Sequence, residues 1–124
     1  MRTLVAIAVA GAAGTLARYG LDRLVDTRTG GGFPWGTLLV NITGAFALGF
    51  LFTLMAERLD VAAWLRTAVT TGFLGAYTTF STLSFETVRL AESGAVVPAV
   101  TNAAGSIVLG VLAAAVGIYA GRLA

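Results

Sequence analysis

Side chains that could bind ions are concentrated in one otherwise apolar stretch of the chain, from Thr70 to Ser84. The stretch combines hydroxyl groups and aromatic rings with two glycines, Gly72 and Gly75. Glycine and consecutive threonine residues weaken a helix, and a broken membrane helix is tolerated only where its freed backbone groups face protein or a polar cavity. The pattern therefore predicts a helix that is interrupted near Gly75 to Thr79.

The carbonyl groups freed by such a break would provide hard oxygen ligands for a bare monovalent cation. Unwound helices of transporters bind sodium in this way. If two copies of the chain in opposite orientations brought their breaks together, the cation would lie on the twofold axis between them. The stretch therefore predicts a cation site that is built from backbone atoms.

Beyond the expected break, Phe80, Ser81 and Ser84 place an aromatic ring beside hydroxyl donors. A phenyl ring carries partial positive charge at its edge, so a ring presented edge-on favours a small anion. Hydroxyl and amide hydrogens would complete an anion path. The alternative interpretation is that Phe80 simply packs and that the hydroxyl groups bond back to their own helix. The residues alone leave both interpretations open.

Three further polar residues lie in apolar surroundings. The amide of Asn41 would be unfavourable in lipid, so we expect it to face a partner or a water-filled path. Asn102 and Ser106 share one helix face with Gly110 at four-residue spacing and form a second polar stripe. Asn102 is either part of this stripe or merely interfacial, and Ser106, which is deeper, is the better candidate for lining a path.

The charged side chains suggest little proton chemistry. Arg18 is either an interfacial anchor of the first helix or a positive group in a wet vestibule. The six carboxylates lie near span ends or in loops, and only Glu86 approaches the deep position that proton-coupled transport usually requires. The chain has no cysteine and no histidine, and it has no paired buried carboxylates, so an enzyme is not expected.

The composition indicates which elements must position these residues. The chain has 124 residues, of which 57% are hydrophobic and 11% charged, whereas about a quarter of the residues in soluble domains are charged. Because a membrane-spanning helix needs about 20 apolar residues, the chain has room for four helices. We expect an all-α membrane protein with one transmembrane domain over residues 1–124. The expected spans are Leu4 to about Leu24, Trp35 to Ala56, about Val61 to Arg89 and Val96 to about Gly121, with breaks at Asp22 to Pro34, Glu57 to Asp60 and Glu92 to Gly94.

The arginines are balanced between the two sides of this arrangement. An excess of Lys and Arg on one side orients a membrane protein, so a balanced count orients the chain weakly. The chain should then insert both ways and form an antiparallel, dual-topology homodimer, unless some arginines are interfacial and the effective count is biased. No basic tail or nucleic-acid patch is present. The two groups are Arg2, Arg58, Arg66 and Arg122 on one side, and Arg18, Arg23, Arg28 and Arg89 on the other.

Small residues at four-residue spacing indicate where helices approach one another. Such patterns let the backbones of two membrane helices come close together. The second and fourth helices should therefore pack tightly. The residues concerned are Asn41, Ala45 and Gly49 in the second helix, and Ala113, Gly117 and Gly121 in the fourth.

Three motifs occur in order along the chain. The first helix has a glycine-rich stretch that ends in Arg18-Tyr19, and the second begins at Pro34-Trp35-Gly36-Thr37 and continues to Val40-Asn41. The third helix carries Gly72-Phe73-Leu74-Gly75-Ala76-Tyr77-Thr78-Thr79-Phe80-Ser81-Thr82. Any one motif is weak, but the ordered set is specific. Along essentially its whole length the chain resembles the CrcB/Fluc family of fluoride channels.

The resemblance implies passive export of fluoride across the cell inner (plasma) membrane by a multi-pass, antiparallel homodimer with two pores. It implies a structural sodium ion bound by the backbone carbonyls of Gly75 and Thr78, and a vestibule cation at Arg18. The implied partners are fluoride, a second inverted copy and the lipid bilayer, with no nucleic acid. The implied pore residues are Asn41, Phe80, Ser81, Thr82, Leu83, Ser84 and Ser106.

Two positions depart from the family pattern. The family usually has a second phenylalanine at the position of Leu83, and leucine offers no polarised ring edge to an anion. Asn102 occupies the position where the family usually has tyrosine. These departures predict slower or less selective conduction than is usual in the family.

Two other functions remain open at this point. A small multidrug/proton antiporter is also a four-helix, dual-topology protein, but its mechanism requires a buried glutamate in the first helix. That helix has no acidic residue before Asp22. A non-conducting subunit of a heterodimeric fluoride channel would fit the absence of phenylalanine at Leu83.

Overall fold

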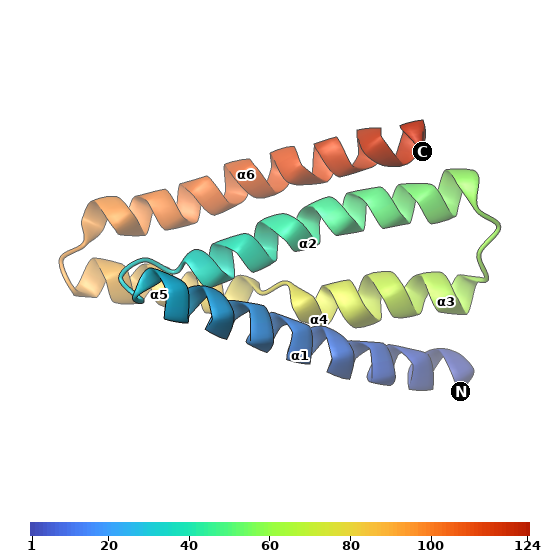
Figure 1. The fold of residues 1–124 in the computed structure, drawn as a ribbon, viewed down its shortest axis with the longest axis horizontal. Coiled ribbons are helices and arrows are strands. Elements are labelled where there is room, and N and C mark those ends of the chain that lie inside the picture. The colour runs from blue at the N-terminus through green and yellow to red at the C-terminus, as the bar shows by residue number, and fades with distance from the viewer.

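The computed structural model describes all 124 residues, and every regular element in it is a helix (Figure 1). Two of the elements, labelled η, are π-helical turns that continue neighbouring helices. The elements are α1 (Arg2–Thr29), α2 (Trp35–Thr53), η1 (Leu54–Arg58), α3 (Ala63–Thr67), η2 (Ala68–Leu74), α4 (Gly75–Tyr77), α5 (Phe80–Glu92) and α6 (Val96–Leu123).

Helix α1 is longer than the sequence predicts. The expected break from Asp22 to Pro34 is wrong in its first part, because α1 continues through Thr29. The stretch from Asp22 to Thr29 contains no glycine or proline that would interrupt the hydrogen-bond ladder. Gly30 then ends the helix in the left-handed conformation with φ 80°, and its N–H donates to the Asp26 carbonyl. Glycine adopts this conformation without a steric penalty.

Helices α2 and α6 pack closely along their length. A Cβ atom added at Gly121 would lie 2.8 Å from the Phe50 carbonyl oxygen, and one at Gly117 or Gly49 would overlap the backbone of the opposite helix. Only residues without a β-carbon allow this separation at those positions. The predicted close helix packing at these small residues is therefore confirmed, and the structure adds that the two helices pack against each other.

The third crossing of the bundle is interrupted, as the sequence predicts, but over a shorter stretch. Only Thr78 and Thr79 are extended, with ψ 156° and 115°. Gly75 keeps helical angles, φ −64° and ψ −35°, so the prediction that the break includes Gly75 is wrong. One glycine weakens a helix by only about 1 kcal/mol, and α4 packs against α1, which supports the helical conformation through Tyr77.

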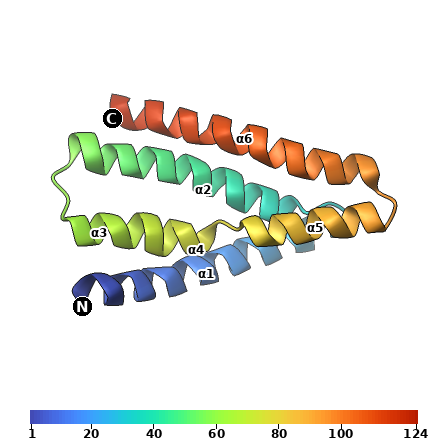
Figure 2. The ribbon, with the colours of Figure 1, turned by 180° about the vertical axis from the view of Figure 1, so that it is seen from behind.

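Both chain termini lie at the same end of the bundle, together with the connection between η1 and α3 (Figures 1 and 2). Neighbouring groups hold three arginines there. Arg58 donates to the Arg122 carbonyl, and Nε of Arg122 lies 3.5 Å from the Glu57 carboxylate. The guanidinium of Arg2 lies 5.1 Å from the centroid of the Trp64 ring.

Arg18 lies beside the break and not at the opposite end of the bundle. It is half-buried, and its Nε donates to the Ala76 carbonyl at 3.1 Å. The predicted balance of four arginines against four therefore needs correction. With Arg18 removed from the count of eight, four arginines lie toward one end and three toward the other.

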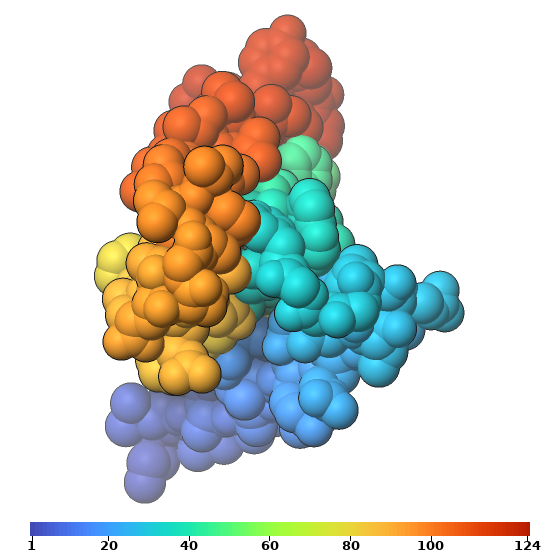
Figure 3. Space-filling view, turned by 90° about the vertical axis from the view of Figure 1, so that its left-hand side faces the viewer, coloured from blue at the N-terminus to red at the C-terminus, as the bar shows by residue number.

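Three helices are long and apolar enough to cross a membrane, namely Arg2–Thr29, Trp35–Arg58 and Val96–Leu123. The interrupted segments from Ala63 to Glu92 run alongside them as a fourth crossing (Figure 2). Seen end-on, α5 and the first turns of α6 lie beside the start of α2 (Figure 3). The predicted all-α architecture with four crossings is confirmed.

Candidate ion site at the helix break

Thr79 ends the break and begins helix α5. Its hydroxyl oxygen accepts a hydrogen bond from the Thr82 N–H at 3.3 Å, and its hydroxyl donates to the Thr82 hydroxyl at 3.0 Å. Threonine is favoured at this position because its side chain satisfies one of the free N–H groups in the first helical turn. The consecutive threonines therefore stop one helix and start the next.

Helix α2 holds the extended pair through Asn41. Nδ2 of Asn41 donates to the Thr79 carbonyl at 3.0 Å, and the Thr79 N–H donates to Oδ1 of Asn41 at 2.8 Å. Gly44, about one turn later, lets Tyr77 and Thr78 approach, because a Cβ atom there would overlap the Thr78 methyl group. The side chain of Asn41 thus replaces the backbone partners that an unbroken helix would supply.

The break leaves carbonyl groups without helical partners. The last helical hydrogen bond before it runs from the Thr78 N–H to the Leu74 carbonyl at 3.1 Å. The Ala76 carbonyl accepts from Arg18, whereas the carbonyls of Gly75 and Thr78 accept no hydrogen bond. Gly75 is also exposed on the surface of the single chain. Two hard oxygen ligands are therefore free at the break.

A cavity of about 250 Å³ lies beside the break, between α2, α5 and α6. It brings together four of the predicted pore residues from three helices. Leu83 and Ser106 are buried in its wall, whereas Phe80 is 78% exposed and forms its rim. The lining residues are Asn41, Thr78, Thr79, Phe80, Leu83, Ser106 and Ile107.

A second cavity of about 300 Å³ continues along α5 and shares Phe80 and Leu83 with the first. Ser84 lines it, but its hydroxyl donates to the Phe80 carbonyl at 2.9 Å. The Ser81 hydroxyl lies 3.4 Å from that of Thr79. In the single chain these hydroxyl groups therefore bond locally, as the alternative interpretation of the sequence predicts.

The polar stripe of α6 is buried. Asn102 has no exposed surface, and its Nδ2 donates to the Thr87 hydroxyl at 3.0 Å. Helix α5 packs against α6 and covers this residue. Ser106 is also buried, and its hydroxyl has no hydrogen-bond partner. It is therefore a free donor beside the first cavity.

Two threonines that sequence reasoning did not single out belong to this polar interior. The Thr37 hydroxyl donates to one carboxylate oxygen of Glu86 at 2.8 Å, and the other oxygen is buried without a partner. The Thr87 hydroxyl accepts from Asn102 and donates to the Leu83 carbonyl. The sequence did contain a signal for Thr37, because this residue lies four residues before Asn41 and therefore on the same helix face.

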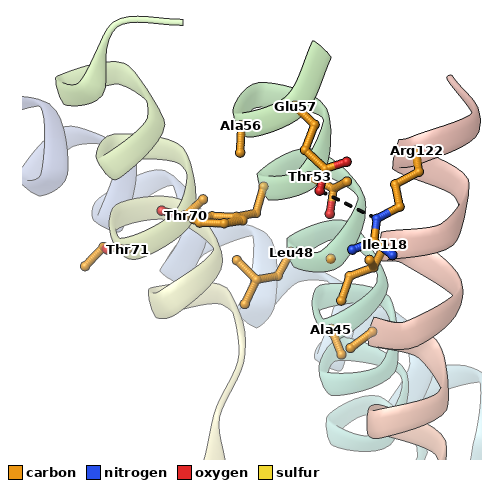
Figure 4. Close-up of a pocket in the computed structure, with 12 residues that line it drawn as sticks. Ala45, Leu48, Thr53, Ala56, Glu57, Thr70, Thr71, Ile118 and Arg122 are labelled. Carbon is orange, nitrogen blue, oxygen red and sulfur yellow. Dashed lines mark ion pairs between the residues drawn. The ribbon is translucent and has the colours of Figure 1, made fainter. Parts of the chain in front are cut away.

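A larger cleft of about 710 Å³ lies in the other half of the bundle, between α2, η1, η2 and α6 (Figure 4). Leu48 and Ile118 line it, and the Glu57–Arg122 ion pair lies at its upper edge in the figure. Thr71, which also lines the cleft, is exposed and precedes the exposed Gly75 by four residues. Both Thr71 and Gly75 are therefore on the surface of the single chain.

Three helices of the chain are long and apolar, and a fourth crossing is interrupted at a polar break beside a cavity. This architecture defines the chain as a small multi-pass helical membrane protein. A model of the family described as "CrcB-like protein, Camphor Resistance (CrcB)" matches residues 5–118. The chain therefore belongs to the CrcB family.

Close relatives share most of the length of the chain. A protein of Magnetococcus marinus named "Fluoride-specific ion channel FluC" is 48% identical over 117 residues, which cover 94% of this chain and 95% of the relative. A protein of Nitratidesulfovibrio vulgaris with the same name is 42% identical over 123 residues, which cover 99% of both chains. "Fluoride-specific ion channel FluC 2" of Geobacillus kaustophilus is 46% identical over 117 residues, which cover 94% of this chain and 91% of the relative.

Proposed function

We propose that this chain is a fluoride-selective channel that lets fluoride leave the cell passively and so limits its toxicity. The observation that carries the proposal is the cavity beside the break, where Asn41, Phe80 and Ser106 converge from three helices. The names of the similar proteins identify the anion. Hydrofluoric acid enters uncharged from acidic surroundings and ionises inside, and the channel returns the trapped anion down its gradient.

The first cavity has the chemistry that a small anion requires. A pore must replace the hydration shell of the ion with hydrogen-bond donors. The Ser106 hydroxyl has no other partner, and the Asn41 amide uses one of its two N–H bonds on Thr79 and keeps the other. The edge of the Phe80 ring adds positive potential. These groups suit fluoride better than a cation.

The wall of the pore would continue along α5. Ser81, Thr82 and Ser84 would turn their hydroxyl hydrogens from local partners toward the ion, with Leu83 as the apolar part of the wall. Arg18 would act as the vestibule cation, because Nε binds Ala76 and the remaining guanidinium N–H groups stay available. A fixed positive charge raises the local concentration of an anion.

The break would also hold a structural sodium ion. The carbonyls of Gly75 and Thr78 fit this ion, because they are hard oxygen ligands that no protein donor occupies. When bound, sodium would supply the positive charge that satisfies these carbonyls. With two carbonyls from each of two copies, the same ion would join the copies at their breaks.

The working form would be an antiparallel homodimer in the lipid bilayer of the inner (plasma) membrane. The weak arginine bias, four toward one end and three toward the other, supports insertion in both orientations. The exposed Gly75 at the break is accessible to a second copy. An antiporter is not supported, because α1 has no acidic residue before Asp22.

Expression of the chain alone in fluoride-sensitive cells tests the proposal. Growth at a fluoride concentration that stops the parent cells would support a self-sufficient channel. No rescue by protein that reaches the membrane would contradict it and would favour a subunit that needs an unlike partner. Tags at both termini, probed separately from each side of the membrane, test the dual topology, which labelling of each terminus from one side only would refute.

A further inference from the structure

Asn41 does more than line the cavity, because both ends of its amide bind one residue of the break. The distances, 3.0 Å from Nδ2 to the Thr79 carbonyl and 2.8 Å from the Thr79 nitrogen to Oδ1, are those of well-formed hydrogen bonds. The pair of bonds fixes the backbone of Thr79 to α2 at the point where the third crossing is extended.

The hydrogen-bond acceptor that the Thr79 N–H would have in a continuous helix is the Gly75 carbonyl. In a continuous α-helix each N–H donates to the carbonyl four residues earlier, so the Thr79 N–H would bond to Gly75. That bond is absent here, although Gly75 itself is still helical and Thr78 still makes the corresponding bond to Leu74. The carbonyl oxygen of Gly75 is free because the Thr79 N–H, which would be its donor in a continuous helix, donates to Oδ1 of Asn41 instead.

We infer that Asn41 is the positioning residue of the cation site, a latch that keeps the Gly75 carbonyl available to a monovalent cation. The inference rests on the proposed sodium site at the break. Without the acceptor oxygen of Asn41, the Thr79 N–H closes the helical bond to Gly75 and withdraws one ligand from the cation. Because Asn41 also lines the first cavity, one side chain connects the cation site with the anion cavity.

The test uses the purified full chain in detergent, with thermal unfolding followed at rising sodium concentration and choline chloride added to keep the ionic strength constant. A bound cation raises the unfolding temperature in proportion to its occupancy, which gives an apparent affinity without any transport assay. We expect Asn41→Ala to raise the sodium concentration for half of the stabilisation by about tenfold or more. The matched control is Ser106→Ala, which lines the same cavity and makes no bond to the break, and it should leave this concentration unchanged.

Asn41→Asp provides a second variant if Asn41→Ala does not fold. At a pH that keeps its carboxyl protonated, it accepts from the Thr79 N–H and donates to the Thr79 carbonyl as the amide does, so the sodium response should stay within about threefold of that of the wild type at the same pH. A tenfold loss of apparent sodium affinity in Asn41→Asp, or an unchanged sodium response in a folded Asn41→Ala, would show that Asn41 does not position the cation site. Neither result would contradict the cation site itself. A wild-type protein that conducts fluoride but shows no sodium response would overturn the cation site, and the latch with it.

Discussion

Gly44 allows the break to lie against α2, and Gly44→Ala should therefore disturb the site. An added Cβ atom would lie 3.0 Å from Cδ1 and 3.3 Å from Cε1 of Tyr77, and it would overlap the Thr78 methyl group. Carbon atoms in contact are about 3.5 to 4.0 Å apart, so the ring must withdraw by roughly 0.5 Å and the methyl group by more. Rotation of the Thr78 side chain is resisted by the bond from its hydroxyl to the Leu74 carbonyl at 3.0 Å.

Overpacking of this kind destabilises a protein by about 1–3 kcal/mol, and the change from glycine to alanine in a helix offsets about 1 kcal/mol of that. We therefore expect Gly44→Ala to reduce the free energy of unfolding by up to about 2 kcal/mol and to lower the unfolding temperature by up to roughly 10 °C. Fluoride flux should fall as well, because Thr78 and the break move away from the cavity that they line.

The assay compares Gly44→Ala with Gly20→Ala, in which the new methyl group meets no atom within 4 Å. Thermal unfolding in detergent and fluoride release from liposomes are measured for both variants. Gly20→Ala should match or slightly exceed the wild type in stability. If Gly44→Ala unfolds at the same temperature and conducts at the same rate as Gly20→Ala, the close contact between α2 and the break does not have the role assigned to it.

Three further predictions follow from single contacts. Leu83→Phe should conduct fluoride as fast as the wild type or faster, because Leu83 lines both cavities and the edge of a ring there would attract the anion. A slower rate would show that the pore is adapted to leucine. Ser106→Ala should lower fluoride flux about tenfold at unchanged stability, because it removes a hydrogen-bond donor for the ion. An unaltered flux would exclude Ser106 from the path. Glu57→Gln should change the free energy of unfolding by less than about 1 kcal/mol and leave fluoride flux unchanged, because the ion pair with Arg122 is half-exposed. A larger loss of stability would mean that this ion pair holds η1 against α6.

The position of the break could be predicted from the sequence, but its length could not. Glycines and consecutive threonines mark where a helix is weak, and this local signal indicated the stretch from Gly75 to Thr79. Where the helix opens depends on which neighbour offers a replacement partner. Asn41, 38 residues away in the chain, binds Thr79 and no other residue of the stretch, so the opening is confined to Thr78 and Thr79.

Residue type and helix face identified much of the candidate site. Residue type singled out Asn41, Phe80 and Ser106, the resemblance to the family added Leu83, and the four do meet at one cavity. Spacing does not predict what covers a face, and the burial of Asn102 under α5 was therefore not predicted.

The ends of helices were the least predictable feature for a related reason. A charged residue such as Asp22 suggests a loop in a hydropathy pattern, but it does not interrupt backbone hydrogen bonding. The helix α1 continues until Gly30 provides a left-handed end. The same distinction applies to Arg18, whose charge suggests an interfacial position, while its bond to Ala76 places it beside the break.

Fluoride release from liposomes tests the central claim most directly. The purified chain is reconstituted alone into liposomes loaded with potassium fluoride or potassium chloride, valinomycin compensates the charge, and ion-selective electrodes follow each anion. A fluoride channel predicts rapid release of fluoride that empty liposomes do not show, with chloride retained. Fluoride release no faster than from empty liposomes, or equal release of chloride, would contradict the account.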